Sequence, residues 1–139
     1  MSTHTVKSTH SVREVKKSTE VTVAEFLGII FSFNSSLKLI HWDIQGKGSY
    51  AAHIALDQAA DTLRHVTDRL VETTIAIKGD LDIVIPETKR PKDYISYIEG
   101  FYIVVDAKRE LFPERFTQSI IDDYQEGIKQ LLFRLKRLQ

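Results

Sequence analysis

The sequence predicts an all-α protein, a four-helix bundle with a long crossover between its second and third helices. Apolar residues recur at helical spacing in four stretches, at about 22–46, 49–78, 93–110 and 113–138. A long connection at 79–92, which holds two prolines, separates the second stretch from the third, as expected where two helices of a bundle run parallel. The chain has 139 residues, of which 42% are hydrophobic and 27% charged, and this composition is typical of one soluble domain.

The chain is predicted to consist of a short tail and the bundle. Residues 1–20 are rich in Ser, Thr and Lys and poor in large apolar groups, so we expect a flexible N-terminal tail followed by the bundle domain at 21–139. The tail has four basic and two acidic side chains, which leaves open either a solubilising terminus or an arm that binds DNA non-specifically.

Composition excludes several classes of site and partner. The net charge is zero, so the chain as a whole gives no argument for nucleic acid or a membrane as partner. There is no cysteine, which rules out disulfides, thiolate metal sites and cysteine nucleophiles. No apolar run approaches membrane-spanning length and the N-terminus has no apolar signal segment, so we expect a cytoplasmic protein without a membrane partner.

The first helix is predicted to begin at a capping box formed by Thr22 and Glu25 and to end near Gly46. It carries two apolar stripes, which favours packing against more than its own bundle. The main stripe, predicted to lie in the core, consists of Phe26, Ile30, Phe33, Leu37, Ile40 and Ile44, and the second stripe consists of Leu27, Phe31 and Trp42.

The second helix is predicted to begin with Ser49 as its N-cap and to end before Gly79. Its apolar face is expected to pack in the core, while His and Asp residues lie on roughly the opposite side. The predicted core residues are Leu56, Ala59, Leu63, Val66, Leu70 and Ile77.

The connection and the last two helices complete the predicted core. Apolar residues of the connection are expected to pack across the bundle, and Pro113 separates the third helix from the fourth. The predicted core residues are Leu81, Ile83, Val84 and Ile85 in the connection, Ile95, Ile98, Phe101, Tyr102 and Val105 in the third helix, and Phe116, Ile120, Tyr124, Ile128, Leu131, Leu135 and Leu138 in the fourth.

Five potential metal ligands stand out: His41 at the end of the first helix, and His53, Asp57, Asp68 and Glu72 on the second. The four on the second helix fall within roughly 100° of one another, on one stripe. Asp57 and Asp68 are nevertheless roughly 16 Å apart along the helix axis, so that one ion cannot touch both.

The spacing of these four residues is symmetric. His53 with Glu72, and Asp57 with Asp68, have the same midpoint along the helix. A second copy of the helix, placed antiparallel by a two-fold axis, would therefore bring His53 opposite Glu72 and Asp57 opposite Asp68. Such a dimer would build two identical sites, each with ligands from both chains.

Asp61 and Arg64 share the same midpoint, which lies between Thr62 and Leu63. In the dimer each Asp61 could face the other chain's Arg64 and fix the register, and the alternative is a weak contact within one chain. For the whole stripe, the alternative is a charged, solvated helix face in a plain helical interaction module.

The ligand pattern resembles that of the Dps-like mini-ferritins, which belong to the ferritin-like superfamily. His41-Trp42-Asp43-Ile44-Gln45-Gly46 is similar to the family's H-W-N-x-x-G motif, with Asp43 in place of Asn. His53, Asp57, Asp68 and Glu72 then follow at the family's intervals. The run at 49–56 is also similar to one in small phage-encoded proteins.

The resemblance implies a ferritin-like four-helix bundle and a hollow dodecamer assembled from two-fold dimers. His41, His53 and Asp57 of one subunit, with Asp68 and Glu72 of its mate, would bind iron and form a ferroxidase site. The implied reaction oxidises Fe(II) to Fe(III) with peroxide or dioxygen, and the cage stores ferric mineral and protects against oxidative damage. The alternative is a non-catalytic cage or DNA-binding architectural protein that uses interface metal only for assembly.

Overall fold

The computed structural model describes residues 21–138, and the predicted flexible tail at 1–20 lies outside this range. The predicted all-α class is confirmed for the described residues. They form four α-helices and one short 3-10 helix: α2 (Val23–Asp43), α3 (Ser49–Lys78), α4 (Tyr94–Lys108), η1 (Arg109–Leu111) and α5 (Arg115–Arg137).

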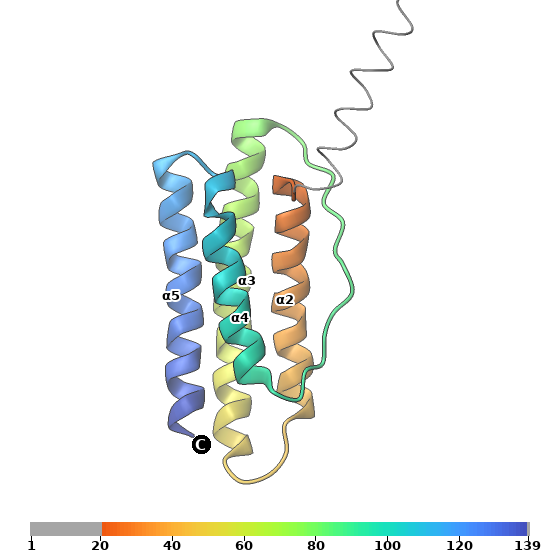
Figure 1. Cartoon of the computed structure of the whole chain (residues 1–139), viewed down its shortest axis with the longest axis vertical. Helices are drawn as coiled ribbons and strands as arrows, with labels where there is room; N and C mark the ends of the chain where they lie inside the picture. Colours follow the sequence, from red (N-terminus) through yellow and green to blue (C-terminus); the bar gives the residue numbers. More distant parts are fainter. Residues whose placement is uncertain (1–20, 139) are drawn as a thin grey trace, which may run out of the picture.

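Figure 1 shows the helices side by side, with α2 and α3 joined by a short turn at one end of the molecule. The helices α4 and α5 are joined at the other end, through η1. Between these two pairs, the segment 79–93 runs from the far end of α3 back along the outside of α2 to the start of α4 (Figure 1). As a result, α3 and α4 point in the same direction.

Two serines of α2 hold this segment against the helix. The Ser32 hydroxyl donates to the carbonyl of Glu87 at 2.9 Å, and the Ser36 hydroxyl accepts from the backbone N–H of Lys89 at 2.8 Å. These bonds give partners to backbone groups that belong to no helix, and so they fix the path of the segment.

The segment also approaches α2 at Gly28, where a Cβ atom would lie 2.1 Å from the carbonyl oxygen of Val84. Glycine is required there because any side chain would collide with this backbone. The contact is made by backbone, so the side chains of Val84 and Ile85 are left 69% and 55% exposed. The prediction that these two side chains pack across the bundle is wrong, whereas Leu81 and Ile83 do pack partly against the core.

The predicted start of the first helix is confirmed. The Thr22 hydroxyl accepts from the Glu25 N–H and the Glu25 carboxylate accepts from the Thr22 N–H, both at 3.1 Å, which completes a capping box. The main apolar stripe of α2 is buried as predicted, except that Ile44 is only partly buried. At its centre the rings of Phe33 and Phe101 stack with centroids 3.9 Å apart.

A chain of buried hydrogen bonds crosses this core. The Tyr124 hydroxyl of α5 donates to Asn34 Oδ1 of α2 at 2.7 Å, and Asn34 Nδ2 donates to Thr67 Oγ1 of α3 at 2.9 Å. Thr67 in turn donates to the carbonyl of Leu63 at 2.7 Å. Because buried polar groups are costly unless they are paired, this chain favours one alignment of three helices.

Besides Val84 and Ile85, three predicted core residues of the helical stretches are exposed: Ile77 by 41%, Phe116 by 57% and Leu138 by 39%. All three lie at helix ends, and apolar spacing identifies the face of a helix but not where its neighbours stop. The predicted N-cap Ser49 is also corrected, because it is the first residue of α3 and Gly48, with φ of 79°, takes the cap position.

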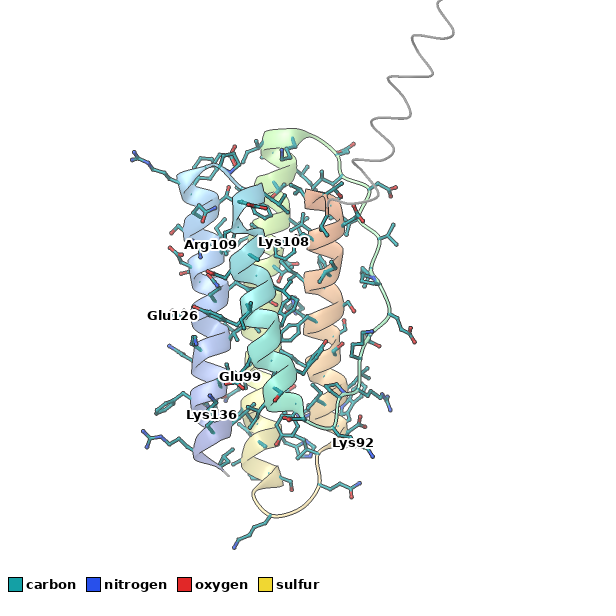
Figure 2. The ribbon with its side chains drawn as sticks, viewed as in Figure 1. Lys92, Glu99, Lys108, Arg109, Glu126 and Lys136 are labelled. Atoms are coloured by element: carbon teal, nitrogen blue, oxygen red, sulfur yellow. The ribbon has the colours of Figure 1, made fainter. Side chains whose placement is uncertain are left out.

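The α4–α5 pair is tied by polar contacts at both ends. Arg109 lies beside α5 in Figure 2, and its guanidinium donates to side-chain oxygens of Gln118, Gln125 and Asp122. Towards the other end, Lys136 of α5 donates to Glu99 of α4 at 2.7 Å (Figure 2). These contacts set the alignment of α5, which also packs on α3.

By length and composition alone, α2 could cross a membrane, and it is the one helix within residues 21–138 that could. This corrects the expectation that no apolar run approaches membrane-spanning length. However, 56% of an 18-residue apolar stretch of this helix is buried inside the bundle, as in the core helix of a soluble protein.

Candidate metal centre

Two of the predicted ligands meet where α2 turns into α3. His41 lies in the last turn of α2 and His53 near the start of α3, and the short connection between the helices brings them together. Their Nδ1 atoms are 3.3 Å apart and their rings are edge-on, with centroids 4.6 Å apart. Both side chains are half-buried.

Backbone carbonyls determine which nitrogen of each ring carries the proton. His41 Nδ1 lies 2.7 Å from the carbonyl oxygen of His53, and because a carbonyl only accepts, Nδ1 is the donor. Its Nε2 then carries a lone pair when the ring is neutral. His53 Nε2 lies 3.3 Å from the carbonyl oxygen of Ile44, which leaves the lone pair on His53 Nδ1, and this atom is 3.3 Å from His41 Nδ1. An N–H bonded to a carbonyl is the usual way in which proteins orient a metal-binding histidine.

Asp57 follows one turn after His53 and forms an ion pair with Lys38 of α2. The hydrogen bond and the positive charge of Lys38 hold the pKa of Asp57 below its usual range. Asp57 is therefore a carboxylate at neutral pH, as a metal ligand must be. Lys38 nevertheless occupies this carboxylate, and a metal ion would have to displace it.

The two remaining ligand candidates lie elsewhere. Asp68 is 3.7 Å from Arg64, and Glu72 is exposed further along α3. Within residues 21–138 no group of three His, Asp or Glu side chains could hold a metal ion. Within a single chain, His41 and His53 therefore lie together, whereas Asp68 and Glu72 lie away from them. The site shared by two chains stays a prediction.

The contact between Asp61 and Arg64 occurs within one chain, where Arg64 Nη2 donates to Asp61 Oδ1 at 3.1 Å. This is the intrachain alternative considered for the pair. The pairing of Asp61 with the Arg64 of a second chain is a prediction that the single chain does not test.

A hollow of about 600 Å³ opens between α2 and α3, beside Lys38 and Asp57. The sequence identified Asp57 as a ligand candidate but not Lys38, which precedes His41 by one turn and therefore lies on the same side of α2. From the second apolar stripe of α2, Leu27 is buried and Trp42 is 62% exposed. The hollow is lined by Phe31, Asn34, Ser35, Lys38, Asp57, Gln58, Ala60, Asp61 and Arg64.

Comparison of the chain with protein-family models, with curated proteins and with solved structures gave no match. The resemblance to the Dps-like mini-ferritins therefore stays a prediction.

Proposed function

We propose that this protein is a ferritin-like mini-ferritin that oxidises Fe(II) to Fe(III) at sites shared by two chains and stores the ferric product in an oligomeric cage. The observation that carries the proposal is the placement of His41 against His53, in which a backbone carbonyl fixes the tautomer of each ring and the two Nδ1 atoms lie 3.3 Å apart. The path of segment 79–93 along α2 supports the ferritin-like crossover between α3 and α4.

The ligand set suits iron as a substrate. Imidazole binds ferrous iron well, carboxylates stabilise the harder ferric ion, and a mixed site of this kind leaves positions open for an oxidant. In the reaction each of two Fe(II) ions gives one electron to hydrogen peroxide. The O–O bond then breaks, and two protons complete two molecules of water.

The dimer supplies what one chain lacks. Asp57 and Asp68 have the same midpoint as His53 and Glu72, so an antiparallel copy of α3 would add two carboxylates to each pair of histidines. The α2–α3 face is the proposed interface, because it carries the hollow beside Asp57 and the exposed Trp42. Exposed aromatic side chains are enriched at protein interfaces.

The first experiment adds Fe(II) anaerobically to the metal-free protein, then hydrogen peroxide, and follows ferric absorbance while native mass is measured in parallel. We expect rapid oxidation by an oligomer. A monomer that oxidises iron no faster than buffer would contradict the proposal.

A mixing experiment tests the shared site directly. His53→Ala and Asp68→Ala chains are each expected to lose activity. In a mixed dimer one site keeps all its ligands and the other lacks both, so mixing should restore part of the activity. The matched control is a mixture of His53→Ala with His41→Ala, which leaves both sites of the mixed dimer incomplete and should restore nothing.

One observation favours the second candidate function, a cage whose interface metal serves only for assembly. Lys38 already forms an ion pair with Asp57. Each iron ion that is oxidised would have to displace Lys38, whereas a metal ion that serves assembly would have to do so only once. This candidate predicts that metal raises the native mass while iron oxidation stays at the rate in buffer. Binding of DNA by residues 1–20 belongs to the same candidate and is tested by gel shift with and without these residues at stated salt.

A further inference from the structure

Asp61 and His65 lie one turn apart on the outer face of α3, and both side chains contact the guanidinium of Arg64. The Nη2 atom of Arg64 is 3.1 Å from Asp61 Oδ1 and 3.3 Å from His65 Nε2. The imidazole and the carboxylate also approach each other, with His65 Nε2 3.8 Å from Asp61 Oδ2. One carboxylate oxygen and one imidazole nitrogen therefore already converge on a single positively charged group.

The contact with Arg64 identifies the form of the histidine. A guanidinium N–H only donates, so His65 Nε2 must accept and carries the lone pair that a metal ion would use. A metal ion here would displace Arg64 from Asp61, and the other carboxylate near this guanidinium is Asp68 at 3.7 Å, itself one of the proposed iron ligands. The side chains of Asp61 and His65 are 66% and 64% exposed, so an ion can reach both.

Two ligands from one chain make only half of a metal site, and the other half follows from symmetry. Asp61 and His65 are centred on Leu63, half a residue from the midpoint shared by the proposed iron ligands. In the antiparallel dimer, Asp61 and the partner's His65 would differ in height by about 1.5 Å along the helix axis. We propose that Asp61 and His65 of both chains form a metal site on the two-fold axis, distinct from the two iron sites.

The ligand set indicates the class of ion. Two imidazole nitrogens and two carboxylate oxygens suit a four-coordinate divalent transition metal, of which Zn(II) is the clearest probe. The site shares no residue with the iron ligands and exists only in the dimer. Zinc would therefore bind the dimer in preference to the monomer and shift the association equilibrium towards it.

This inference rests on the proposed dimer, and its test separates the two. Zinc binding is measured by competition with a chromogenic chelator, and association by sedimentation with and without zinc, on the full chain. The variant is His65→Ala, at an exposed position where the helix is expected to persist, with circular dichroism as the check. His65→Ala is made in two backgrounds, the wild-type chain and the His41→Ala/His53→Ala chain. The second background removes the imidazoles of both iron sites and keeps the axial site.

In both backgrounds we expect the parent dimer to bind one axial zinc per two chains, and zinc to lower its dissociation constant by about tenfold or more. His65→Ala should lose both this zinc and the effect of zinc on association. Asp61→Asn should behave like His65→Ala. If His65→Ala binds zinc and associates as its parent does, the axial site is excluded even where iron oxidation is normal. If the axial zinc is present but iron is not oxidised, the proposed function fails and this site stands. A chain that stays monomeric with zinc overturns both.

Discussion

Replacing Tyr124 by Phe removes one hydroxyl from the centre of the bundle and leaves the ring in place. Tyr124 is 1% exposed, and its hydroxyl donates to Asn34 Oδ1 at 2.7 Å, while Asn34 is itself only 8% exposed. The substitution leaves this buried acceptor without a donor, which costs about 1–3 kcal/mol of the free energy of unfolding. For a chain of this size, a loss near 2 kcal/mol lowers Tm by about 5–10 °C.

The measurement is urea unfolding followed by circular dichroism, at one protein concentration because association would add to the apparent stability. The control is Tyr102→Phe: this hydroxyl has no hydrogen-bond partner among residues 21–138, and its ring faces the Lys129 ammonium at 4.3 Å. We expect the control to change stability by less than about 0.5 kcal/mol. The reasoning is refuted if Tyr124→Phe is no more destabilising than Tyr102→Phe.

A double variant sharpens the test. Asn34→Leu alone leaves the Tyr124 hydroxyl unpaired, whereas Asn34→Leu with Tyr124→Phe removes both partners, and Thr67 keeps its bond to the Leu63 carbonyl. The double variant should therefore cost less than the sum of the single changes, by about 1–2 kcal/mol. Strict additivity would show that the hydroxyl and the amide are not coupled.

The same hydroxyl gives a pH dependence. Burial, with a smaller contribution from Tyr97, raises the pKa of Tyr124 well above its ordinary value of 10.0. Above pH 10.0 the unfolded chain loses this proton first, so it binds fewer protons than the folded chain and stability falls as pH rises. Tyr124→Phe removes this contribution, so its stability should fall less steeply above pH 10.0 than that of Tyr102→Phe.

Two further predictions concern α2 and its neighbours. Lys38→Met removes the hydrogen bond and charge that lower the pKa of Asp57, so this pKa should rise towards 3.8 in an NMR titration. Metal should then bind Asp57 more readily. An unchanged pKa of Asp57 would contradict the ion pair. Gly28→Ala places a methyl group 2.1 Å from the Val84 carbonyl and should cost about 1–3 kcal/mol in urea unfolding. Gly100→Ala, with nothing within 4 Å of the new Cβ, should instead stabilise by about 0.5–1 kcal/mol, and equal effects at both glycines would rule out the close approach.

Local patterns predicted the helices well because their causes are local. The capping box of Thr22 and Glu25 could be read from four consecutive residues, and it is present. Exposure of Ile77 and Phe116 could not be read in this way, since it depends on where neighbouring helices end. No local signal marked Gly28 either, because its partner lies on a distant segment.

For the candidate site, the resemblance to the mini-ferritins implied that His41 and His53 of one chain belong to the same site, and the two side chains lie together. It did not predict the ion pair of Lys38 with Asp57, because contacts between long side chains on different helices depend on how those helices pack. For Arg64, helical spacing left both a contact within the chain and one with a partner open, and the intrachain contact is present.

The histidine pair and the distant acids have a consequence for how activity depends on dilution. On the proposed function, a chain alone holds the histidine end of one site and the acidic end of another, with Asp57 and Asp68 roughly 16 Å apart along α3. Below the dissociation constant of the dimer, the rate of iron oxidation would then rise with the square of protein concentration rather than in proportion to it. In a mixed population, a chain lacking Asp68 would disable the histidine end of its partner while its own histidine end stays active, so the output would fall in proportion to the fraction of defective chains.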